Sequence, residues 1–438
     1  MINLANIQLG STATQSKIQK TLTYRYVIYI VVALAYFFVY FHRTSTAVMA
    51  PELIRDFKID PAALGLFGSM YFYAYALGQL PAGILADRWG NRKTISVFVL
   101  IAAAGALLFG FASNFSVALV GRFLVGLGVG FVYVPAMRFL ADWFKKNEFA
   151  TYSGLLLAIG NIGSLASSAP LVAMMAAIGW RNSMNIVGII TIAIAVLAYA
   201  FIRNKPTDVG GATIAEIEGT APAGPAPAAI GIGESLKIIA STYNFWTITV
   251  LFFAMYGSIM GFQGLWAGPY LMNVYGMTKT EAGKILMMIP IGMIFGCPLS
   301  GVISDKILKS RKKVVFGGTL IYILTWLPLV FMIDSMSKGF LTVLMFFYGF
   351  FGGFFVVMYA NLKENVAPQI AGTGTGFLNL FVFVGGATFQ QVMGAIIGSY
   401  PTINKVIPVA AFKSAFTFCL VALIVAVAFY ATQKEKTA

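Results

Sequence analysis

Apolar runs of about 20 residues recur along the whole chain, and each is long enough to cross the hydrocarbon core of a bilayer as a helix. Only 10% of the 438 residues are charged, whereas a soluble domain carries about 25%. Too little polar sequence remains to cover a water-soluble surface. The sequence therefore predicts an all-α, polytopic membrane protein.

The spacing of the apolar runs predicts twelve transmembrane helices in two groups of six. We expect these helices over 25–48, 62–86, 94–112, 116–141, 150–173, 183–202, 244–272, 282–304, 314–333, 339–362, 371–397 and 409–431. The segment between the groups is rich in Pro, Ala and Gly, which is typical of a flexible linker. The predicted organisation is a segment over 1–24, a bundle over 25–202, a linker over 203–238, a bundle over 239–431 and a tail over 432–438.

The distribution of Lys and Arg predicts the orientation of the chain. Bases such as Lys17, Lys145 and Lys306 concentrate in the loops on one side, which the positive-inside rule assigns to the cytoplasm. We therefore expect both termini in the cytoplasm and the protein in the inner membrane. This rule also accounts for the formal net charge of +15, so we expect no nucleic-acid partner. Cys297 and Cys419 lie inside apolar runs and are not expected to form a disulfide.

The two predicted bundles share a sequence pattern. Gly83 and Asp87 recur 218 residues later as Gly301 and Asp305. Gly65 recurs at the same offset as Gly283. Parallel repeats of this kind are typical of alternating-access transporters, in which the substrate binds between the halves near the bilayer midplane.

The first copy of the repeated stretch reads PAGILADRWGNRK, residues 81–93. Its pattern, G-x-x-x-D-R-x-G-x-[RK]-[RK], resembles the signature loop of the major facilitator superfamily. The resemblance covers the entire chain and implies two pseudo-symmetric six-helix bundles. We expect Gly83 to allow close helix packing, and Asp87 to cap a helix of the other half or to pair with Arg88 or Arg92. The expected gating residues are Gly83, Asp87, Arg88, Gly90, Arg92, Arg138 and Asp305.

Two arginines lie inside apolar runs, whereas no carboxylate lies at the centre of a predicted helix. Ionisable groups at membrane depth are costly and mark functional sites, and Arg binds carboxylate or phosphate bidentately. Arg43 and Arg122 therefore predict an anionic substrate. Arg43 could instead snorkel to the headgroups, and Arg122 could lie near the outer surface. The candidate substrate-binding residues are Arg43, Arg122, Tyr36, Tyr40, Tyr75, Gln79, Gln263, Tyr359, Asn361 and Asn379, although the aromatic ones could simply be packing residues.

The stretches HRTSTAVMAPEL, GRFLVGLGVGFVYVPAMR and GPYLMNVYGMT resemble the anion:cation symporter branch of the superfamily. The resemblance implies that Arg43 and Arg122 line the anion site. At two positions where many members of the branch carry an acid, this chain has His42 and Val129. His42 is the single histidine and titrates near neutral pH when unperturbed, so it is the candidate for proton coupling. Alternatively, His42 packs in the core and the protein is a uniporter, an anion exchanger or a Na⁺-coupled carrier.

These features predict a monomeric secondary active transporter that moves a small organic anion, with a proton as the coupling ion and the bilayer as its environment. A carrier or exporter of a neutral or zwitterionic solute, and a transporter-like ligand sensor, remain alternatives. An enzyme is disfavoured because the chain has one histidine and no internal pair of acids. We expect no cofactor and no metal site.

Overall fold

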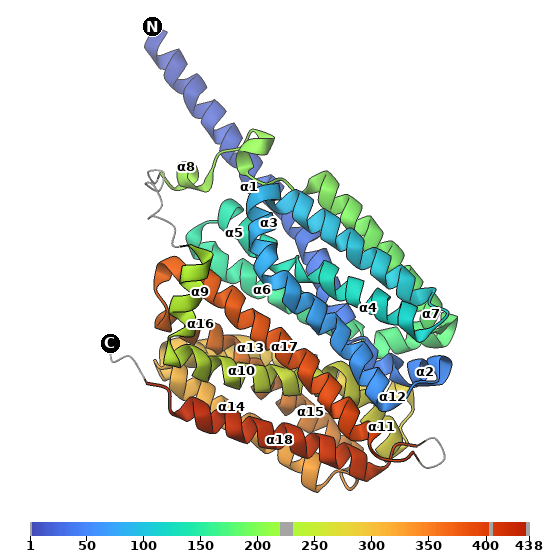
Figure 1. Ribbon diagram of the computed structural model, residues 1–438. Coiled ribbons are helices and arrows are strands. Elements are labelled where there is room, and N and C mark those ends of the chain that lie inside the picture. Colours follow the sequence, from blue (N-terminus) through green and yellow to red (C-terminus); the bar gives the residue numbers. More distant parts are fainter. Residues whose placement is uncertain (1, 220–230, 403–405, 435–438) are drawn as a thin grey trace.

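The computed structural model describes residues 2–219, 231–402 and 406–434, and its elements are helices (Figure 1). Eleven of these helices are long and apolar enough to span a membrane. The longest, α3 (Pro61–Gly110), has 50 residues and is interrupted at Gly90, whose φ of 78° and ψ of 166° are not helical. Dividing α3 at Gly90 gives two spanning segments in place of one, which brings the total to the twelve that the sequence predicts.

The N-terminal bundle contains the elements from α1 to α7. They are α1 (Ile2–Thr44), α2 (Thr46–Phe57), α3, α4 (Phe115–Gly130), α5 (Tyr133–Trp143), α6 (Lys146–Ala166) and α7 (Ala169–Phe201). Non-helical Gly179, with φ 78°, divides α7 between the fifth and sixth predicted spans. Asp60 and Asn114 start two of the helices, because their side chains accept hydrogen bonds from Ala63 N at 2.7 Å and Val117 N at 3.0 Å.

The C-terminal bundle begins at α10. Its elements are α10 (Tyr243–Gly261), η2 (Phe262–Trp266), α11 (Ala267–Tyr275), α12 (Lys279–Leu286), α13 (Met288–Val302), η3 (Ile303–Ile307), α14 (Arg311–Phe331), α15 (Lys338–Gly352), η4 (Gly353–Val356), α16 (Val357–Asn365), η5 (Pro368–Ile370), α17 (Ala371–Gly398) and α18 (Val409–Ala431). The segments η2 and η3 are π-helical turns. Such turns are rare and often occur at functional sites.

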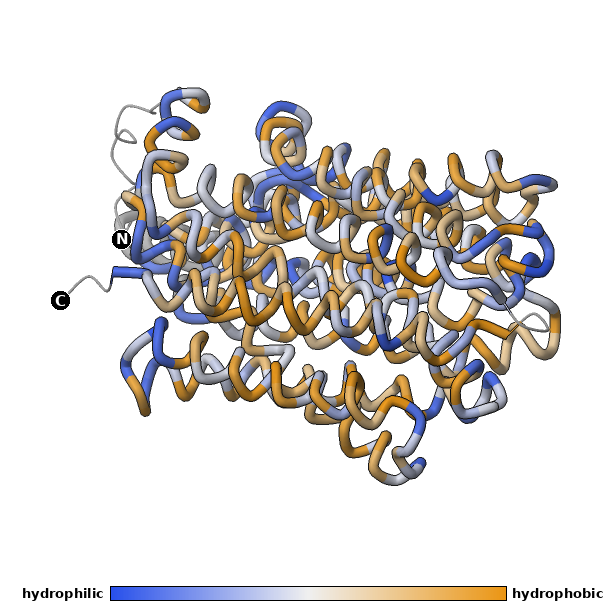
Figure 2. Tube along the Cα trace, turned by 60° about the horizontal axis from the view of Figure 1, so that its bottom comes forward, coloured by the Kyte–Doolittle hydropathy of each residue, from blue (hydrophilic) through white to orange (hydrophobic). Residues whose placement is uncertain are grey.

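The two bundles lie against each other along their helices (Figure 1). Contacts between them run through α3 with α17 and through α6 with α13. Both termini lie at one end of the helices, which we call the terminal end, and α2, α11 and α12 lie at the opposite end (Figure 1). Apolar residues run along the helices, while hydrophilic residues concentrate at helix ends and connections (Figure 2).

The segments outside the spans are more helical than the sequence suggests. The predicted N-terminal segment 1–24 is continuous with the first span, because α1 runs from Ile2 to Thr44 without a break. The predicted linker 203–238 holds η1 (Pro206–Val209), α8 (Ile214–Glu218) and the start of α9 (Ile232–Ala240). Its residues 220–230, and 435–438 of the predicted tail, lie outside the described residues.

At the opposite end the two bundles meet through glycines. A Cβ atom on Gly268 would lie 2.1 Å from Ala47 O, and one on Gly65 would lie 2.8 Å from Gln390 O. A Cβ atom on Gly283 would lie 3.2 Å from Ala169 Cα of the other bundle. Because glycine has no side chain, it lets the backbones of neighbouring membrane helices approach closely. We call these three contacts the closed seam; two of its glycines, Gly65 and Gly283, are the pair that the 218-residue repeat relates.

Candidate substrate site between the bundles

Arg43 is held near the end of α1 by aromatic rings from both bundles. It is only 4% exposed, so its side chain does not extend to the lipid headgroups. Its guanidinium carbon lies 4.3 Å from the ring centre of Tyr40, 5.3 Å from Tyr75 and 5.5 Å from Phe383, a residue of the C-terminal bundle. Among the described residues no carboxylate lies within 4.0 Å of it, and its Nε has no hydrogen-bond partner. Cation–π contacts stabilise this charge without neutralising it.

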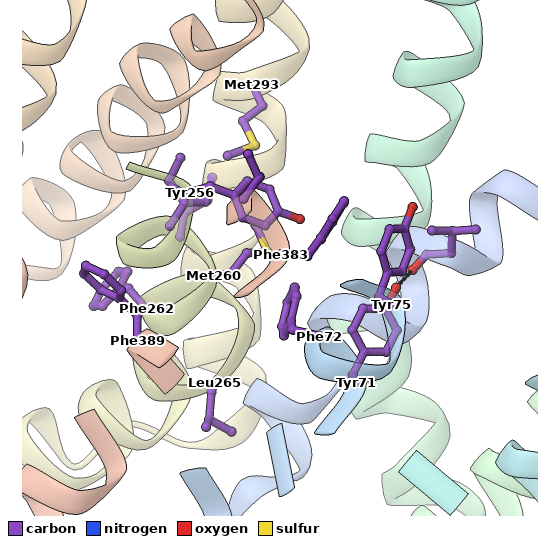
Figure 3. Close-up of a cluster of buried hydrophobic side chains, with 14 of the residues drawn as sticks. Tyr71, Phe72, Tyr75, Tyr256, Met260, Phe262, Leu265, Met293, Phe383 and Phe389 are labelled. Atoms are coloured by element: carbon purple, nitrogen blue, oxygen red, sulfur yellow. Dashed lines mark hydrogen bonds between the residues drawn. The ribbon is translucent and has the colours of Figure 1, made fainter. Parts of the chain in front are cut away.

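Further aromatic residues extend this site across the interface. Tyr36 lies 5.3 Å from Tyr40 between ring centres, and Tyr75 lies 4.0 Å from Phe383. Tyr256 faces Tyr75 and Tyr71 from the other bundle, with Phe72 and Phe383 between them (Figure 3). The Tyr256 hydroxyl is buried and has no partner among the described residues. The interface therefore combines one uncompensated cation, apolar ring faces and a free hydroxyl, which suits an anion with an organic body.

Arg122 lies inside the N-terminal bundle and not at the interface. It is 2% exposed, so it does not lie at an outer surface. Its Nη1 donates a hydrogen bond of 2.7 Å to His42 O, and its guanidinium carbon lies 4.8 Å from the ring centre of Tyr71. Its Nε and Nη2 have no partner in the described part of the chain. Unpaired buried donors are costly, so an anion or water reaching Arg122 would be strongly held.

His42 is fully buried, and its ring contacts aromatic neighbours on its own helix. The ring centre lies 6.2 Å from that of Phe38 and 5.9 Å from that of Phe41. Neither ring nitrogen has a partner among the residues described. The guanidinium of Arg122 donates to the backbone oxygen of His42, and its positive charge would repel a protonated imidazole. A proton on His42 would therefore need a compensating anion nearby.

A chain of hydroxyl and amide groups links the bundles beside Arg43. Gln263, in the π-helical turn η2, donates from Nε2 to Ser164 Oγ at 3.3 Å. Ser164 lies 3.0 Å from Thr44 Oγ1, which donates to Tyr40 O at 3.1 Å. Gln263 Oε1 is buried and lacks a partner among the described residues. The sequence interpretation found Gln263 but missed Thr44 and Ser164, because small hydroxyl residues carry no signal within apolar runs.

Four other predicted binding residues make hydrogen bonds within their own bundle. Gln79 donates to Tyr75 O at 3.3 Å. Asn361 donates to Tyr430 Oη at 2.5 Å, towards the terminal end and away from Arg43. Tyr359 donates to Asn379 Oδ1 at 2.7 Å inside the C-terminal bundle. The structure thus brings together Arg43, Tyr36, Tyr40 and Tyr75, and it adds Phe383, which has no polar signature in the sequence.

The predicted partners of Asp87 are wrong for this conformation. Asp87 pairs with Arg138 of the same bundle, and not with Arg88, Arg92 or a helix of the other half. Arg92 instead donates to Tyr199 O at 2.6 Å. In the second repeat Asp305 pairs with Arg311, which also contacts Glu364 at 3.0 Å, again within one bundle. Both acids border cavities at the terminal end, of about 240 Å³ at Asp87 and 830 Å³ at Asp305.

Two glycines of the repeated loop differ in what they do. Gly83 was expected to allow close helix packing, but a Cβ there would only touch Val134 at 4.0 Å, which is ordinary contact. Gly90 is required by its backbone, since φ is 78° and a Cβ would lie 2.4 Å from Asn204. The loop glycine that the fold needs is therefore Gly90.

Comparison with known proteins identifies the family. The family model of the Major Facilitator Superfamily matches residues 32–390 and 268–437. The chain belongs to this superfamily, as the signature loop predicts, and is a multi-pass membrane transporter and not an enzyme.

Several similar proteins are named as transporters of organic anions. The chain is 26% identical over 395 residues to a probable sulfoacetate transporter of Cupriavidus necator, covering 86% of this chain and 89% of that protein. It is 26% identical over 385 residues to a hexuronate transporter of Bacillus subtilis, covering 83% and 86%. Its fold is similar to that of a bacterial homologue of the human lysosomal transporter Spinster in an inward-facing, unoccupied conformation. The TM-score is 0.71 and the identity 20%, with 93% and 96% of the two chains covered.

Proposed function

We propose that this chain is a secondary active transporter that moves a small carboxylate or sugar acid across the inner membrane by alternating access. The observation that carries the proposal is Arg43, a buried cation at the bundle interface with aromatic contacts from both halves and no acid within 4.0 Å among the described residues. A substrate carboxylate would supply the missing negative charge through charge-assisted hydrogen bonds. Sulfoacetate and hexuronate, which the relatives' names give as their substrates, are anions of this kind.

The proposed orientation places the terminal end in the cytoplasm, because the loops there carry the excess of Lys and Arg. The closed seam then lies at the external end. In this assignment the bundles 25–202 and 239–431 move against each other, joined by 203–238, and the buried site between them becomes accessible from the cytoplasm when the terminal end opens. One chain supplies both halves of the site, which supports a monomer as the transporting unit.

Proton symport is the coupling mode that we propose, with His42 as the proton carrier. An anion near Arg43 and Arg122 would offset the repulsion that those cations exert on a protonated imidazole. Arg122 donates a hydrogen bond to the backbone oxygen of His42, which supports a charge interaction between the guanidinium and a protonated His42. Substrate binding would therefore favour proton binding. Uniport and anion exchange are the competing modes.

Uptake into proteoliposomes tests the function. Labelled glucuronate and sulfoacetate are offered to wild type, Arg43→Ala and Arg43→Lys. We expect the Ala variant to lose uptake by at least about 100-fold, since an Arg–carboxylate contact can contribute about 3 kcal/mol, and the Lys variant to recover only part of it. Arg55→Ala, at a side chain that is 71% exposed, is the control. A folded Arg43→Ala protein with wild-type uptake would refute the proposal.

A further inference from the structure

Glu52 forms an ion pair that joins the two bundles at the opposite end. It lies in α2, and its carboxylate pairs through Oε1 with Lys279, the first residue of α12 in the C-terminal bundle. Glu52 is 7% exposed, and it is the only buried Asp or Glu in the described part of the chain. A buried acid whose counter-charge comes from the other moving half is a candidate for a function in the transport cycle.

The neighbouring charged groups are already paired within their own bundles. In α2, Asp56 pairs with Arg55 and, at 2.8 Å, with Arg181 of α7. In α12, Glu281 pairs with Lys338 at 2.6 Å. Lys279 is therefore the cation that compensates Glu52. Their pair is situated beside the seam contact of Gly268 with Ala47, since α2 packs against α11 and α12 follows α11.

The pair is only half satisfied, which suits a contact that must break. Glu52 Oε2 is buried and has no hydrogen-bond partner among the described residues. Burying a carboxylate is costly unless its oxygens are paired. When the bundles separate at this end, water can reach both oxygens and the Lys279 ammonium. Hydration in the open state therefore offsets much of the attraction in the closed state, so the two states remain close in free energy.

We propose that Glu52 and Lys279 form a charge latch that holds the external end closed and so sets how often the empty carrier opens outward. The inference rests on the proposed alternating-access function and orientation. Removing the Lys279 charge leaves the Glu52 carboxylate buried without compensation in the closed state alone. Removing the Glu52 charge takes away the attraction that holds Lys279, whose side chain is 40% exposed, against α2. Either change therefore favours the outward-open state. Reversing both charges restores an attraction across the seam.

The test measures opening directly, without a substrate. Thr46→Cys places a reporter thiol on α2, at a position 2% exposed in the closed state. A membrane-impermeant maleimide added outside then labels it in vesicles, in a background in which Cys297 and Cys419 are replaced by serine. We compare Glu52→Gln, Lys279→Gln and the double variant Glu52→Lys with Lys279→Glu. Glu281→Gln is the matched control, since it removes an exposed ion pair at the same end within one bundle.

Both single variants should be labelled about fivefold faster or more, the range expected for a coupling of about 1 kcal/mol. The double variant should return towards the wild-type rate, and Glu281→Gln should not change it. Wild-type labelling in both single variants, or equal acceleration in Glu281→Gln, overturns the latch. The double variant separates the latch from damage to folding, because a merely destabilised seam is not rescued by reversing charges. Labelling needs no substrate, so a failed uptake assay leaves this result independent of the proposed function.

Discussion

The contact between Gly268 and Ala47 allows a steric test of whether the closed seam opens. Gly268→Ala would place a Cβ atom 2.1 Å from Ala47 O across the two bundles. Carbon and oxygen atoms of this type approach to about 3.3 Å at closest. The backbones would therefore have to separate by about 1 Å. Only the closed arrangement of the opposite end brings these atoms together, so the strain acts on that state alone.

The magnitude follows from this clash. Overpacking a well-packed contact costs about 1–3 kcal/mol. If the open state avoids the clash, that free energy shifts the balance towards it by about 5- to 150-fold. A matched control lies within one bundle: a Cβ on Gly292 of α13 would lie 2.1 Å from Phe346 O of α15. Gly292→Ala imposes the same clash on a contact that alternating access does not separate.

The measurement is the rate at which an external maleimide labels Thr46→Cys in each variant. We expect Gly268→Ala to accelerate labelling with little loss of thermal stability, because the strained contact can open. Gly292→Ala should lower the melting temperature of the purified protein and leave labelling unchanged. Unaltered labelling in a folded Gly268→Ala protein, or acceleration of the same size in Gly292→Ala, would refute the assignment of this seam as a moving interface.

Two further predictions concern protons. Burial alone would raise the pKa of the Asp56 carboxyl, but hydrogen bonds from Trp180, Arg55 and Arg181 lower it to about 2. The stabilisation, of about 1 kcal/mol or less for exposed partners, is then complete above the unfolded pKa of about 4 and lost as the pH falls towards about 2. The melting temperature of Asp56→Asn should therefore fall less than that of wild type in this range, and parallel curves would contradict it. His42→Gln should abolish accumulation of labelled glucuronate driven by an imposed pH gradient while downhill uptake continues; wild-type accumulation in this variant would exclude His42 as the coupling site.

The number and order of the spanning segments could be predicted because each depends on local sequence. A helix must satisfy its own backbone in the bilayer and needs an apolar run of defined length, so the runs alone locate the helices. Helix continuity was harder to predict. Gly90 and Gly179 interrupt their helices with φ of 78°. The length and position of the apolar runs do not predict such a break.

The partners of charged residues could be predicted less well, because they depend on which bundle surfaces meet. The sequence places Arg43 inside a span, and the structure adds the ring of Phe383 from 340 residues further along the chain. It also shows that Arg122 lies inside the N-terminal bundle and not at the interface, held by its hydrogen bond to His42 O. Asp87 illustrates the same limit: its acidity is evident from the sequence, but its pairing with Arg138 depends on the conformation of the bundle.

The two ends of the molecule differ in where their ion pairs lie. At the opposite end Glu52 pairs across the bundles, whereas at the terminal end Asp87 and Asp305 pair inside their own bundles. If the carrier alternates, closing the terminal end must bring the loops of the two bundles together and part Glu52 from Lys279. The end that closes would then replace ion pairs within one bundle by ion pairs between the bundles, and the end that opens would do the reverse. The number of ion pairs would stay nearly constant through the cycle, which keeps the two states close in free energy and leaves substrate binding able to choose between them.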